Sequence, residues 1–426
     1  MVKPKNKNMS THKQLTLGLF GFGVVGEGLY KILKQTPSLN ARIKRIVIKH
    51  PDKKRNAPGE IFTQLANEVL NDDSINVIVE LIDDADAAYY IVTEALKKGK
   101  AVVSANKKLI AEHLEELLAL QKKHNVPFLY EASTCASIPV IRNLEEYYDN
   151  DLLHSVSGIV NGSTNFILSK IFNEGLEFVE ALLQAQQLGF AESNPSLDVL
   201  GIDAVNKLTI LLVHAYGIVT QPTSILFNGI QNIQVQDAKV ANEKEFKIKL
   251  VAKAVKLKNG KIAAYLLPQF VTADTQLYNV ENEYNGVVIE SGFSDKQFFY
   301  GKGAGSFPTA SAVLIDISAL RYNYKYEYKK KYQSVENKLS NEYYLKVYVS
   351  YDNLKSVQKD AFEWIEEFHS GQQRSYFVGV IHAEKLLKDD WWKQHDVSLI
   401  LTPEPIIENI DYRDVQKRSL ELAGVL

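Results

Sequence analysis

The stretch that decides the fold runs from Leu15 to Gly26 and reads LTLGLFGFGVVG. A short β-prone run comes first, then a turn with three glycines, and then a helical pattern that continues through Leu33. Strand, glycine turn and helix in this order are the context that a GxGxxG motif requires. Gly21 permits the tight turn, Gly23 lets a pyrophosphate approach the backbone, and Gly26 lets the helix pack closely on the strand. The stretch predicts a dinucleotide-binding site; the alternative is a turn that serves packing alone.

The residues after this turn continue the same pattern as far as residue 140. Further β-prone runs lie at residues 42–49, 77–82, 101–103 and 128–130, and helical patterns lie at residues 89–98 and 112–124. Strands that alternate with helices predict a parallel sheet covered on both faces. We therefore expect a Rossmann-type α/β domain over residues 15–140.

The end of the second predicted strand bears on the choice of dinucleotide. An acidic residue at this position would hold the ribose 2′-OH of NAD. Here Ile48 is followed by Lys49 and His50, and a second basic group, residues 53–55, comes shortly after. Such a loop suits a 2′-phosphate and favours NADP over NAD, although a basic surface loop is also an ordinary solvated feature.

Length and composition limit the class of protein. The 426 residues are too many for one core and suit two or three domains. The formal net charge of -2 gives no indication of nucleic acid or an anionic membrane surface as a partner, and no apolar run approaches membrane-spanning length. The single cysteine suits a reducing compartment. The polar tail over residues 1–14, expected to be disordered, lacks the apolar core of a signal peptide. These features predict a cytoplasmic protein.

From about residue 152 the pattern becomes that of an α+β domain. We expect a strand at residues 155–160, a turn at 161–165 that opens a helix, helices at 178–188 and 202–216, and strands at 246–257 and 262–270. Asn259-Gly260 predicts a hairpin between the last two strands, and Asn285-Gly286 predicts a second hairpin. The domain, placed over residues 141–305, would offer an antiparallel sheet to a homodimer or higher homo-oligomer.

The last third of the chain contains a glycine-rich segment, a linker and a further small domain. Glycines at 301, 303 and 305 indicate a second close approach of backbone to a ligand, or a linker that crosses between domains. A helix within residues 306–325 is expected to return to the nucleotide domain, and a tyrosine-rich linker follows at 326–339. A small α+β domain over 340–426 would contain a strand at 343–349, a helix at 357–368 and strands at 376–382 and 397–401.

Two charged residues interrupt an apolar helical pattern near residue 205. Asp203 and Lys207 are four apart, so they share one face of the predicted helix. Such side chains are rarely buried unless they are paired, and Glu192 and Asp198 lie just upstream. A partly desolvated lysine beside carboxylates can have a pKa tuned toward neutrality, which suits proton transfer. A structural ion pair at the start of the helix is the alternative.

Five segments together resemble the homoserine dehydrogenase family. They are GFGVVG (21–26), VSANK (103–107), GIVNGSTNFIL (158–168), AQQLGFAESNPSLDVLGIDAVNKLTIL (185–211) and GKGAGSFPTASAV (301–313). The segments stand in the family's order and cover roughly residues 15–320, a suitable size for two domains. The resemblance implies NAD(P)-dependent interconversion of L-homoserine and L-aspartate 4-semialdehyde, in the biosynthesis of threonine, methionine and isoleucine. We expect a single-activity enzyme.

The resemblance also implies roles for individual residues. Lys207 matches the family's proton donor, and Lys107 matches a lysine between cofactor and substrate. Glu192 and Asp203 match substrate-binding acids, Asp203 also orienting Lys207, and Asp198 falls at another acid of the same motif. The residues implied in cofactor binding are Gly21, Phe22, Gly23, Val24, Val25, Gly26, Lys49, Ile82, Ser104, Lys107 and Gly303. For Lys107 the alternative is a solvated residue after a strand.

The segment EASTCASIP at residues 131–139 matches a family region that binds a monovalent cation such as Na+ through one carboxylate and backbone carbonyls. The positions carried over are Glu131, Thr134, Ala136 and Ile138. The segment departs from the glycine-rich sequence common in the family, and Cys135 is interpreted as a packed thiol. Residues 340–426 resemble the family's ligand-sensing ACT domain, without its usual Pro-Gly turn. Two other functions remain open: another NAD(P)-dependent dehydrogenase, or a dinucleotide-binding sensor.

Overall fold

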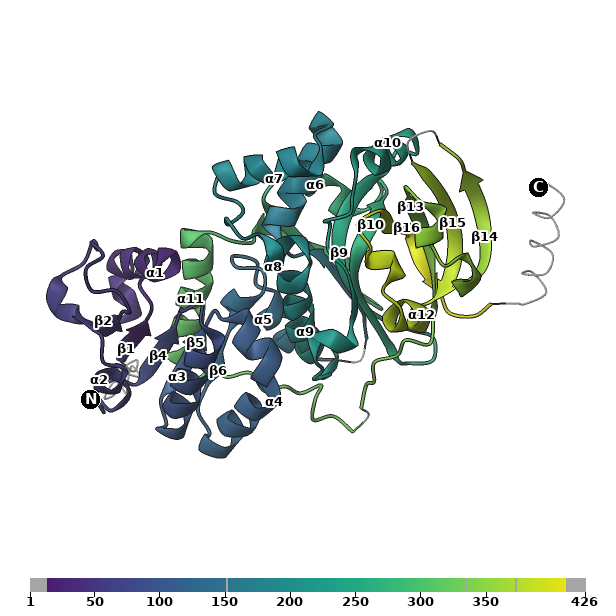
Figure 1. The fold of residues 1–426 in the computed structure, drawn as a ribbon. Coiled ribbons are helices and arrows are strands. Elements are labelled where there is room, and N and C mark those ends of the chain that lie inside the picture. The colour runs from purple at the N-terminus through teal and green to yellow at the C-terminus, as the bar shows by residue number, and fades with distance from the viewer. Residues whose placement is uncertain (1–13, 151, 335, 372–373, 411–426) are drawn as a thin grey trace, which may run out of the picture. The chain divides into compact units, whose positions relative to one another are not determined.

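The computed structural model describes residues 14–410 apart from residues 151, 335 and 372–373 (Figure 1). The tail expected over residues 1–14 thus lies, except for Gln14, outside the described residues, as does the last part of the segment 340–426. Two compact units make up the described chain: residues to Pro139 with Ala304–Glu327, and Val140–Gly303 with the residues from Tyr328 onward. Every helix within the described ranges is too short or too polar to cross a bilayer.

The first unit contains a six-stranded parallel sheet in the order β3-β2-β1-β4-β5-β6. Its strands are β1 (Leu15–Phe20), β2 (Ala41–Val47), β3 (Phe62–Thr63), β4 (Val77–Glu80), β5 (Ala101–Ser104) and β6 (Phe128–Leu129). Its longer helices are α1 (Val24–Gln35), α3 (Ala85–Lys97) and α4 (Lys107–His124), with a short α2 (Ala66–Leu70). All side chains of β1 and β4 are buried, as expected of central strands covered on both faces. The predicted Rossmann-type sheet is confirmed.

Two helices of this unit begin earlier than their apolar patterns predict, because side chains cap them. The Asp84 carboxylate accepts a hydrogen bond from Ala87 N at 3.0 Å and starts α3 at Ala85. Likewise, Asn106 Oδ1 accepts from Leu109 N at 3.0 Å and starts α4 at Lys107. Capping of this kind satisfies backbone N–H groups that lack a partner within the helix.

A helix from much later in the chain completes the first unit. α11 (Ser306–Leu320) lies beside α1 (Figure 1), and Ser306 Oγ donates a hydrogen bond to the carbonyl of Val24 at 2.7 Å. Gly28 allows this approach, because a Cβ at this position would lie 2.6 Å from Ser306 Oγ. The helix predicted within residues 306–325 is confirmed.

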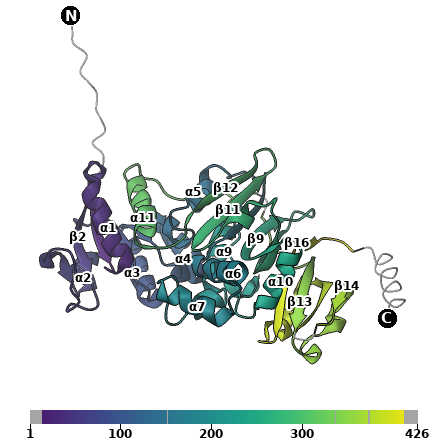
Figure 2. The same ribbon diagram turned by 90° about the horizontal axis from the view of Figure 1, so that it is seen from above.

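The second unit is built on one large mixed sheet in the order β12-β11-β7-β9-β10-β16-β13-β15-β14, with β8 also paired to β10. Figure 2 labels β12, β11 and β9 in this order, and β7 lies between β11 and β9 in the sheet. The strands of its first part are β7 (Leu153–Ile159), β8 (Leu226–Phe227), β9 (Lys247–Lys256), β10 (Ile262–Val271), β11 (Tyr284–Ser291) and β12 (Asp295–Lys302). The helices of this part are α5 (Val140–Glu146), α6 (Gly162–Glu174), α7 (Phe178–Gln187), α8 (Ser196–Val199), α9 (Ile202–Tyr216) and α10 (Val235–Glu243).

One predicted hairpin of this sheet is confirmed and the other is wrong. β9 and β10 pair antiparallel across a turn in which Gly260 has φ +81°. By contrast, Asn285 and Gly286 lie inside β11, and the turn to β12 falls after Ser291. Gly286 is required by packing, since a Cβ there would lie 2.6 Å from a Val280 methyl carbon. The Asn-Gly pair therefore marks a close approach within a strand.

The C-terminal segment starts with three successive strands, so the helix predicted over residues 357–368 is wrong. Its elements are β13 (Tyr344–Tyr351), β14 (Phe362–His369), β15 (Ser375–His382), α12 (Ala383–Lys388) and β16 (Val397–Ile407). Residues of β14, among them Phe362 and Trp364, pair with β15 instead of forming a helix. The ACT-like character expected for residues 340–426 stays a prediction.

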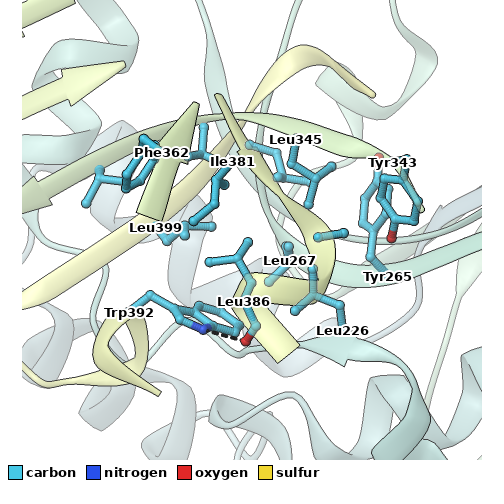
Figure 3. Close-up of a cluster of buried hydrophobic side chains, with 14 of the residues drawn as sticks. Leu226, Tyr265, Leu267, Tyr343, Leu345, Phe362, Ile381, Leu386, Trp392 and Leu399 are labelled. Carbon is cyan, nitrogen blue, oxygen red and sulfur yellow. Dashed lines mark hydrogen bonds between the residues drawn. The ribbon is translucent and has the colours of Figure 1, made fainter. Parts of the chain in front are cut away.

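These C-terminal strands share a hydrophobic core with the earlier part of the second unit. Figure 3 shows Leu226 of β8 and Tyr265 and Leu267 of β10 beside side chains of the C-terminal segment. Those labelled from this segment are Tyr343, Leu345, Phe362, Ile381, Leu386, Trp392 and Leu399. Trp392 is fully buried, and its indole N–H donates to the carbonyl of Leu386 at 2.8 Å. Burial of this common core stabilises both segments together.

Candidate active site

The glycines of the first turn have different surroundings. Gly21 has φ +94°, and a Cβ there would lie 2.5 Å from the carbonyl oxygen of Leu81. A Cβ on Gly26 would lie 2.5 Å from the carbonyl oxygen of Gly21. At Gly23, however, an added Cβ would meet no heavy atom within 4 Å. Packing therefore explains two of the glycines, and Gly23 leaves open space at the N-terminus of α1, where an anion is favoured.

A cavity of about 590 Å³ lies at the carboxyl ends of β1, β2 and β4. The glycine turn, the residues after β2 and the turn after β4 line it, with Ala87 and Ile91 of α3. Its size lies in the range of small-molecule sites, about 300–1,000 Å³, and ligands of open α/β sheets bind at this edge. The cavity, together with the open space at Gly23, therefore suits a dinucleotide.

The cofactor-binding residues inferred from sequence fall into four groups. Gly21, Phe22, Gly23, Lys49 and Ile82 line the cavity, together with Lys53 and Arg55 of the basic loop. Val24, Val25 and Gly26 form the first turn of α1, while Ser104 and Lys107 stand at the end of β5 and the start of α4. Gly303 belongs to the second unit, beside the side chain of Asn285. A Cβ on Gly303 would lie 1.8 Å from Asn285 Nδ2.

Glu80 is a residue of this region that the sequence analysis did not single out. Its side chain is completely buried at the end of β4 and accepts hydrogen bonds from Ile82 N at 2.8 Å and Ser104 Oγ at 2.5 Å. Burial raises the pKa of Glu80 to about 7. The available signal was an acid at the end of an otherwise apolar central strand, VIVE.

In the second unit, Asp203 and Lys207 lie on one face of α9, as their spacing predicts. Lys207 Nζ and Asp203 Oδ2 are 2.8 Å apart, with side-chain exposures of 9% and 3%. Lys207 Nζ also donates a hydrogen bond to the carbonyl of Val160, which directly follows β7, at 2.8 Å. Because α9 is buried from Asp203 to Tyr216, the charged pair occupies an apolar setting in which each partner offsets the desolvation of the other.

Asn161 joins this pair to a further acid. Its Nδ2 donates to Asp203 Oδ2 at 2.9 Å and to Asp198 Oδ1 at 2.7 Å, while its Oδ1 accepts from Thr164 N at 2.9 Å and caps α6. The sequence predicts only a hydrogen-bonding turn here. The asparagine fixes a group of two carboxylates and one ammonium in which Asp198 alone is half-buried and the other two are buried.

The remaining predicted residues lie at two other places. Glu192 is exposed on the loop between α7 and α8. Lys107 is half-buried as the first residue of α4 in the first unit, whereas Lys207 belongs to the second unit. In chemical terms, the group around Asp203 offers a carboxylate to a cationic ligand and an ammonium to an oxygen that gains negative charge.

The segment predicted to hold a cation lies in the first unit and is buried. Glu131, Thr134, Ala136 and Ile138 are each at most 2% exposed. Ala136 has φ +44°, which turns the backbone sharply, and Cys135 is buried. Over the described ranges no three His, Cys, Asp or Glu side chains gather as a metal cluster. A cation here would depend on one carboxylate and backbone carbonyls, the oxygen ligands that hard cations accept.

Two family descriptions match this chain. "Homoserine dehydrogenase" matches residues 139–318, and "Homoserine dehydrogenase, NAD binding domain" matches residues 21–131. Together they cover the cavity at the glycine turn and the charged group on α9.

Similar proteins carry the same description. The homoserine dehydrogenase of Lactococcus lactis is 36% identical over 314 residues, which cover 71% of this chain and 73% of that protein. The crystal structure of a homoserine dehydrogenase from Thiobacillus denitrificans has a TM-score of 0.79 at 27% identity and covers 92% of this chain and 98% of that one. A hyperthermophilic archaeal homoserine dehydrogenase in complex with NADPH has a TM-score of 0.63 at 27% identity, over 73% of this chain and 99% of that chain. The chain therefore belongs to the homoserine dehydrogenase family of oxidoreductases.

Proposed function

We propose that the protein interconverts L-homoserine and L-aspartate 4-semialdehyde with NADP as the preferred cofactor, in the biosynthesis of threonine, methionine and isoleucine. The observation that carries this proposal is the buried Asp203–Lys207 pair, 2.8 Å between Oδ2 and Nζ, within a family match. A structural ion pair would not need the half-buried carboxylate of Asp198 held beside it through Asn161.

The acids of the second unit bind the amino-acid end of the substrate. Homoserine carries an α-ammonium group, which a carboxylate binds through charge-assisted hydrogen bonds. Asp198 is half-buried and keeps one carboxylate oxygen beyond the bond that it accepts from Asn161. Glu192, exposed on the preceding loop, is the second acid that would reach this ammonium.

Lys207 handles the proton of the reacting hydroxyl. The bond to Asp203 and the bond to the Val160 carbonyl occupy two of its three N–H groups, so the third is directed by both. In the reduction, the Lys207 ammonium donates a proton to the oxygen as negative charge develops there, and Lys207 becomes a neutral amine. In the oxidation of homoserine, the neutral amine of Lys207 accepts the hydroxyl proton and becomes the ammonium again. Lys107, the first residue of α4, is proposed as the second catalytic lysine. When bound, the nicotinamide accepts or donates the hydride.

The preference for NADP rests on the basic loop after β2. Lys49, Lys53 and Arg55 line the cavity, and positive side chains suit a 2′-phosphate. The archaeal homoserine dehydrogenase of similar fold was solved with NADPH. Steady-state rates with NADP+ and with NAD+ test the preference, and an equal or higher kcat/KM with NAD+ contradicts it.

A monovalent cation such as Na+ is proposed at the segment of Glu131, with the carbonyls of Thr134, Ala136 and Ile138. All four positions are buried on one loop of the first unit, and its backbone turns at Ala136. We expect Na+ to raise the midpoint of thermal unfolding relative to tetramethylammonium at equal ionic strength, because binding to the folded state alone stabilises it. Equal midpoints would contradict the site.

A cytoplasmic homodimer or higher homo-oligomer is also proposed. The second unit offers an extended sheet whose edge strand β12 exposes Phe298 and Tyr300. Light scattering coupled to gel filtration reports the mass directly, and a species of the 48.0 kDa chain mass at micromolar concentration would contradict an oligomer.

Substitution of Lys207 tests the proposed chemistry. We expect Lys207→Ala to lower kcat by about 10²-fold or more, the effect of a lost acid–base group, in an assay that follows the absorbance of the reduced cofactor. Lys170→Ala is the matched control, because Lys170 forms a surface pair with Glu174 on α6. L-Serine and L-threonine should support little turnover. A Lys207→Ala enzyme with the wild-type kcat would refute the assigned role.

A further inference from the structure

We infer that Glu80 is a positioning residue that holds the cofactor-binding turn after β4 in register with the start of α4, which carries Lys107. The inference rests on the proposed function, because it concerns how this chain prepares its cofactor site and its second lysine. None of the roles assigned above uses this buried carboxyl group.

A closed ring of hydrogen bonds connects the two loops. Ile82 N donates to Glu80 Oε1 at 2.8 Å, and Ser104 Oγ donates to Glu80 Oε2 at 2.5 Å. Asn106 N then donates to Ser104 Oγ at 3.1 Å, and Asn106 Nδ2 donates to the carbonyl of Ile82 at 3.1 Å. Oε1 of Glu80 thus binds the turn after β4, and Oε2 binds the end of β5.

Both ends of this ring lie at the proposed site. On one side, Leu81 and Ile82 line the cavity, and the carbonyl of Leu81 is the group against which Gly21 packs. On the other side, Asn106 Oδ1 accepts a hydrogen bond from Leu109 N at 3.0 Å and caps α4. This cap places Lys107 at the first position of the helix. A shift of Glu80 would therefore move the cofactor turn and Lys107 together.

The position of Glu80 favours a functional reason over a purely structural one. The side chain is fully buried in a sheet, and its hydrogen-bond donors here are a hydroxyl and a backbone amide, neither of them charged. An apolar residue would avoid the desolvation of a carboxylate at this place. Local departures from such packing preferences are concentrated at functional sites.

The neighbours of Glu80 in the sheet and in the adjoining turn determine the charge of its side chain. The paired residue on β1 is Phe20 and that on β5 is Ser104, and Asp83 in the adjoining turn is an acid. Desolvation raises the pKa of Glu80, the hydrogen bonds from Ser104 and Ile82 N lower it, and Asp83 raises it slightly, so that the net pKa is about 7. The ionised form accepts at both oxygens, so the ring is complete when Glu80 is ionised.

The test compares full-length wild type with Glu80→Ala, Glu80→Gln and a control, Glu68→Gln, at an exposed glutamate of α2 in the same unit. We expect Glu80→Ala to raise KM for NADP+ about tenfold or more, the size of a lost hydrogen bond to a charged group. KM for L-homoserine should change by less than about twofold, because the acids that bind it belong to the other unit. Glu80→Gln should raise KM for NADP+ by a smaller factor.

A binding measurement separates this role from simple loss of folded protein. NADPH fluorescence titrations should show wild-type affinity falling below about pH 7, where Glu80 becomes protonated. The fall should be smaller in Glu80→Gln, where the 2′-phosphate of NADPH still titrates but residue 80 does not. A variant that only unfolds in part would lose active sites without a change in the dissociation constant of those that remain. Unaltered NADPH affinity and KM for NADP+ in both Glu80 variants would overturn the inference.

The same titration keeps the two proposals distinct. A wild type that binds NADPH but does not oxidise homoserine would contradict the proposed function and leave the Glu80 comparison intact. A wild type that oxidises homoserine, with Glu80 variants that match it in KM for NADP+, would contradict only the role of Glu80.

Discussion

Gly21 and Gly23 stand two positions apart in one turn, yet they differ in what a side chain would meet. We expect Gly21→Ala to destabilise the protein, because φ is +94° and the Cβ would lie 2.5 Å from the Leu81 carbonyl oxygen. Gly23→Ala should change the free energy of unfolding by no more than about 0.5 kcal/mol and weaken NADPH binding strongly, since the open space at this position is proposed to hold the pyrophosphate.

Urea denaturation and NADPH titration measure these two effects separately. Gly59→Ala is the control, because a Cβ on Gly59 also meets no atom within 4 Å. If Gly23→Ala bound NADPH as tightly as wild type, the pyrophosphate would have to lie elsewhere.

The raised pKa of Glu80 also predicts how the free energy of unfolding depends on pH. Its folded pKa, about 7, is raised above the ordinary 4.5, so the folded chain binds the proton more tightly than the unfolded chain. The contribution of this group is therefore fully present below about pH 4.5 and is lost as pH rises through about 7, a change of about 3 kcal/mol. Glu80→Gln removes this titration, so it should gain stability over wild type as pH rises from about 5 to 8. Chemical denaturation across this range measures the difference, and a constant difference would contradict the expectation.

At the scale of elements, the N-terminus of α6 links helix stability to the acids of the site. We expect Asn161→Ala to lose about 1 kcal/mol of stability, because the cap on Thr164 N is removed. It should also lower kcat/KM for homoserine by about tenfold or more, since Asp198 and Asp203 lose their common donor.

Glu177→Ala is the matched control for this prediction. Glu177 takes part in the capping box of α7, so its loss should reduce stability by a similar amount and leave kcat/KM unchanged. Denaturation and steady-state kinetics of both variants decide the matter: equal losses of stability with equal kcat/KM would show that Asn161 is a cap and nothing more.

At the scale of the second unit, a buried polar network connects α10 to the C-terminal strands. The Arg374 guanidinium donates to Ser350 Oγ at 2.9 Å and to Ser398 Oγ at 2.8 Å, and Ser350 Oγ donates in turn to Asp237 Oδ1 at 2.6 Å. Asp237 is completely buried on α10. The network spans segments that are more than a hundred residues apart in the chain.

Breaking this network should destabilise the unit. We expect Arg374→Ala to cost about 3–5 kcal/mol of unfolding free energy. It removes the positive charge 3.9 Å from the buried Asp237 carboxylate, which then keeps neutral donors such as Ser350. Lys244→Ala is the control. Lys244, the residue that follows α10, pairs with Glu367 of the C-terminal segment at 2.9 Å, but the two side chains are 37% and 43% exposed. Such an exposed pair contributes at most about 1 kcal/mol. Equal losses in urea denaturation would show that burial of the network is unimportant.

Much of the fold followed from local patterns. Helix α9 begins at Ile202 and ends at Tyr216, the predicted bounds, because Gly201 and Gly217 at its ends both adopt the left-handed conformation. The central strands of the Rossmann-type sheet could likewise be predicted from the sequence, since they are short apolar runs between helices. Local signals failed where distant residues decide the conformation, as in β14, whose side chains are placed by pairing with β15.

The sequence by itself determined the parallel sheet, the glycine turn, and the shared helix face of Asp203 and Lys207, since each depends on residues close together in the chain. Only the tertiary structure decided that Asn161 joins Asp198 to Asp203, that Glu80 bridges two loops, and that Asn285-Gly286 lies inside a strand. Each of these outcomes depends on donors, acceptors or packed atoms contributed by separate elements. The spacing of residues along the chain does not indicate contacts between separate elements, because these contacts form only when the strands and helices pack.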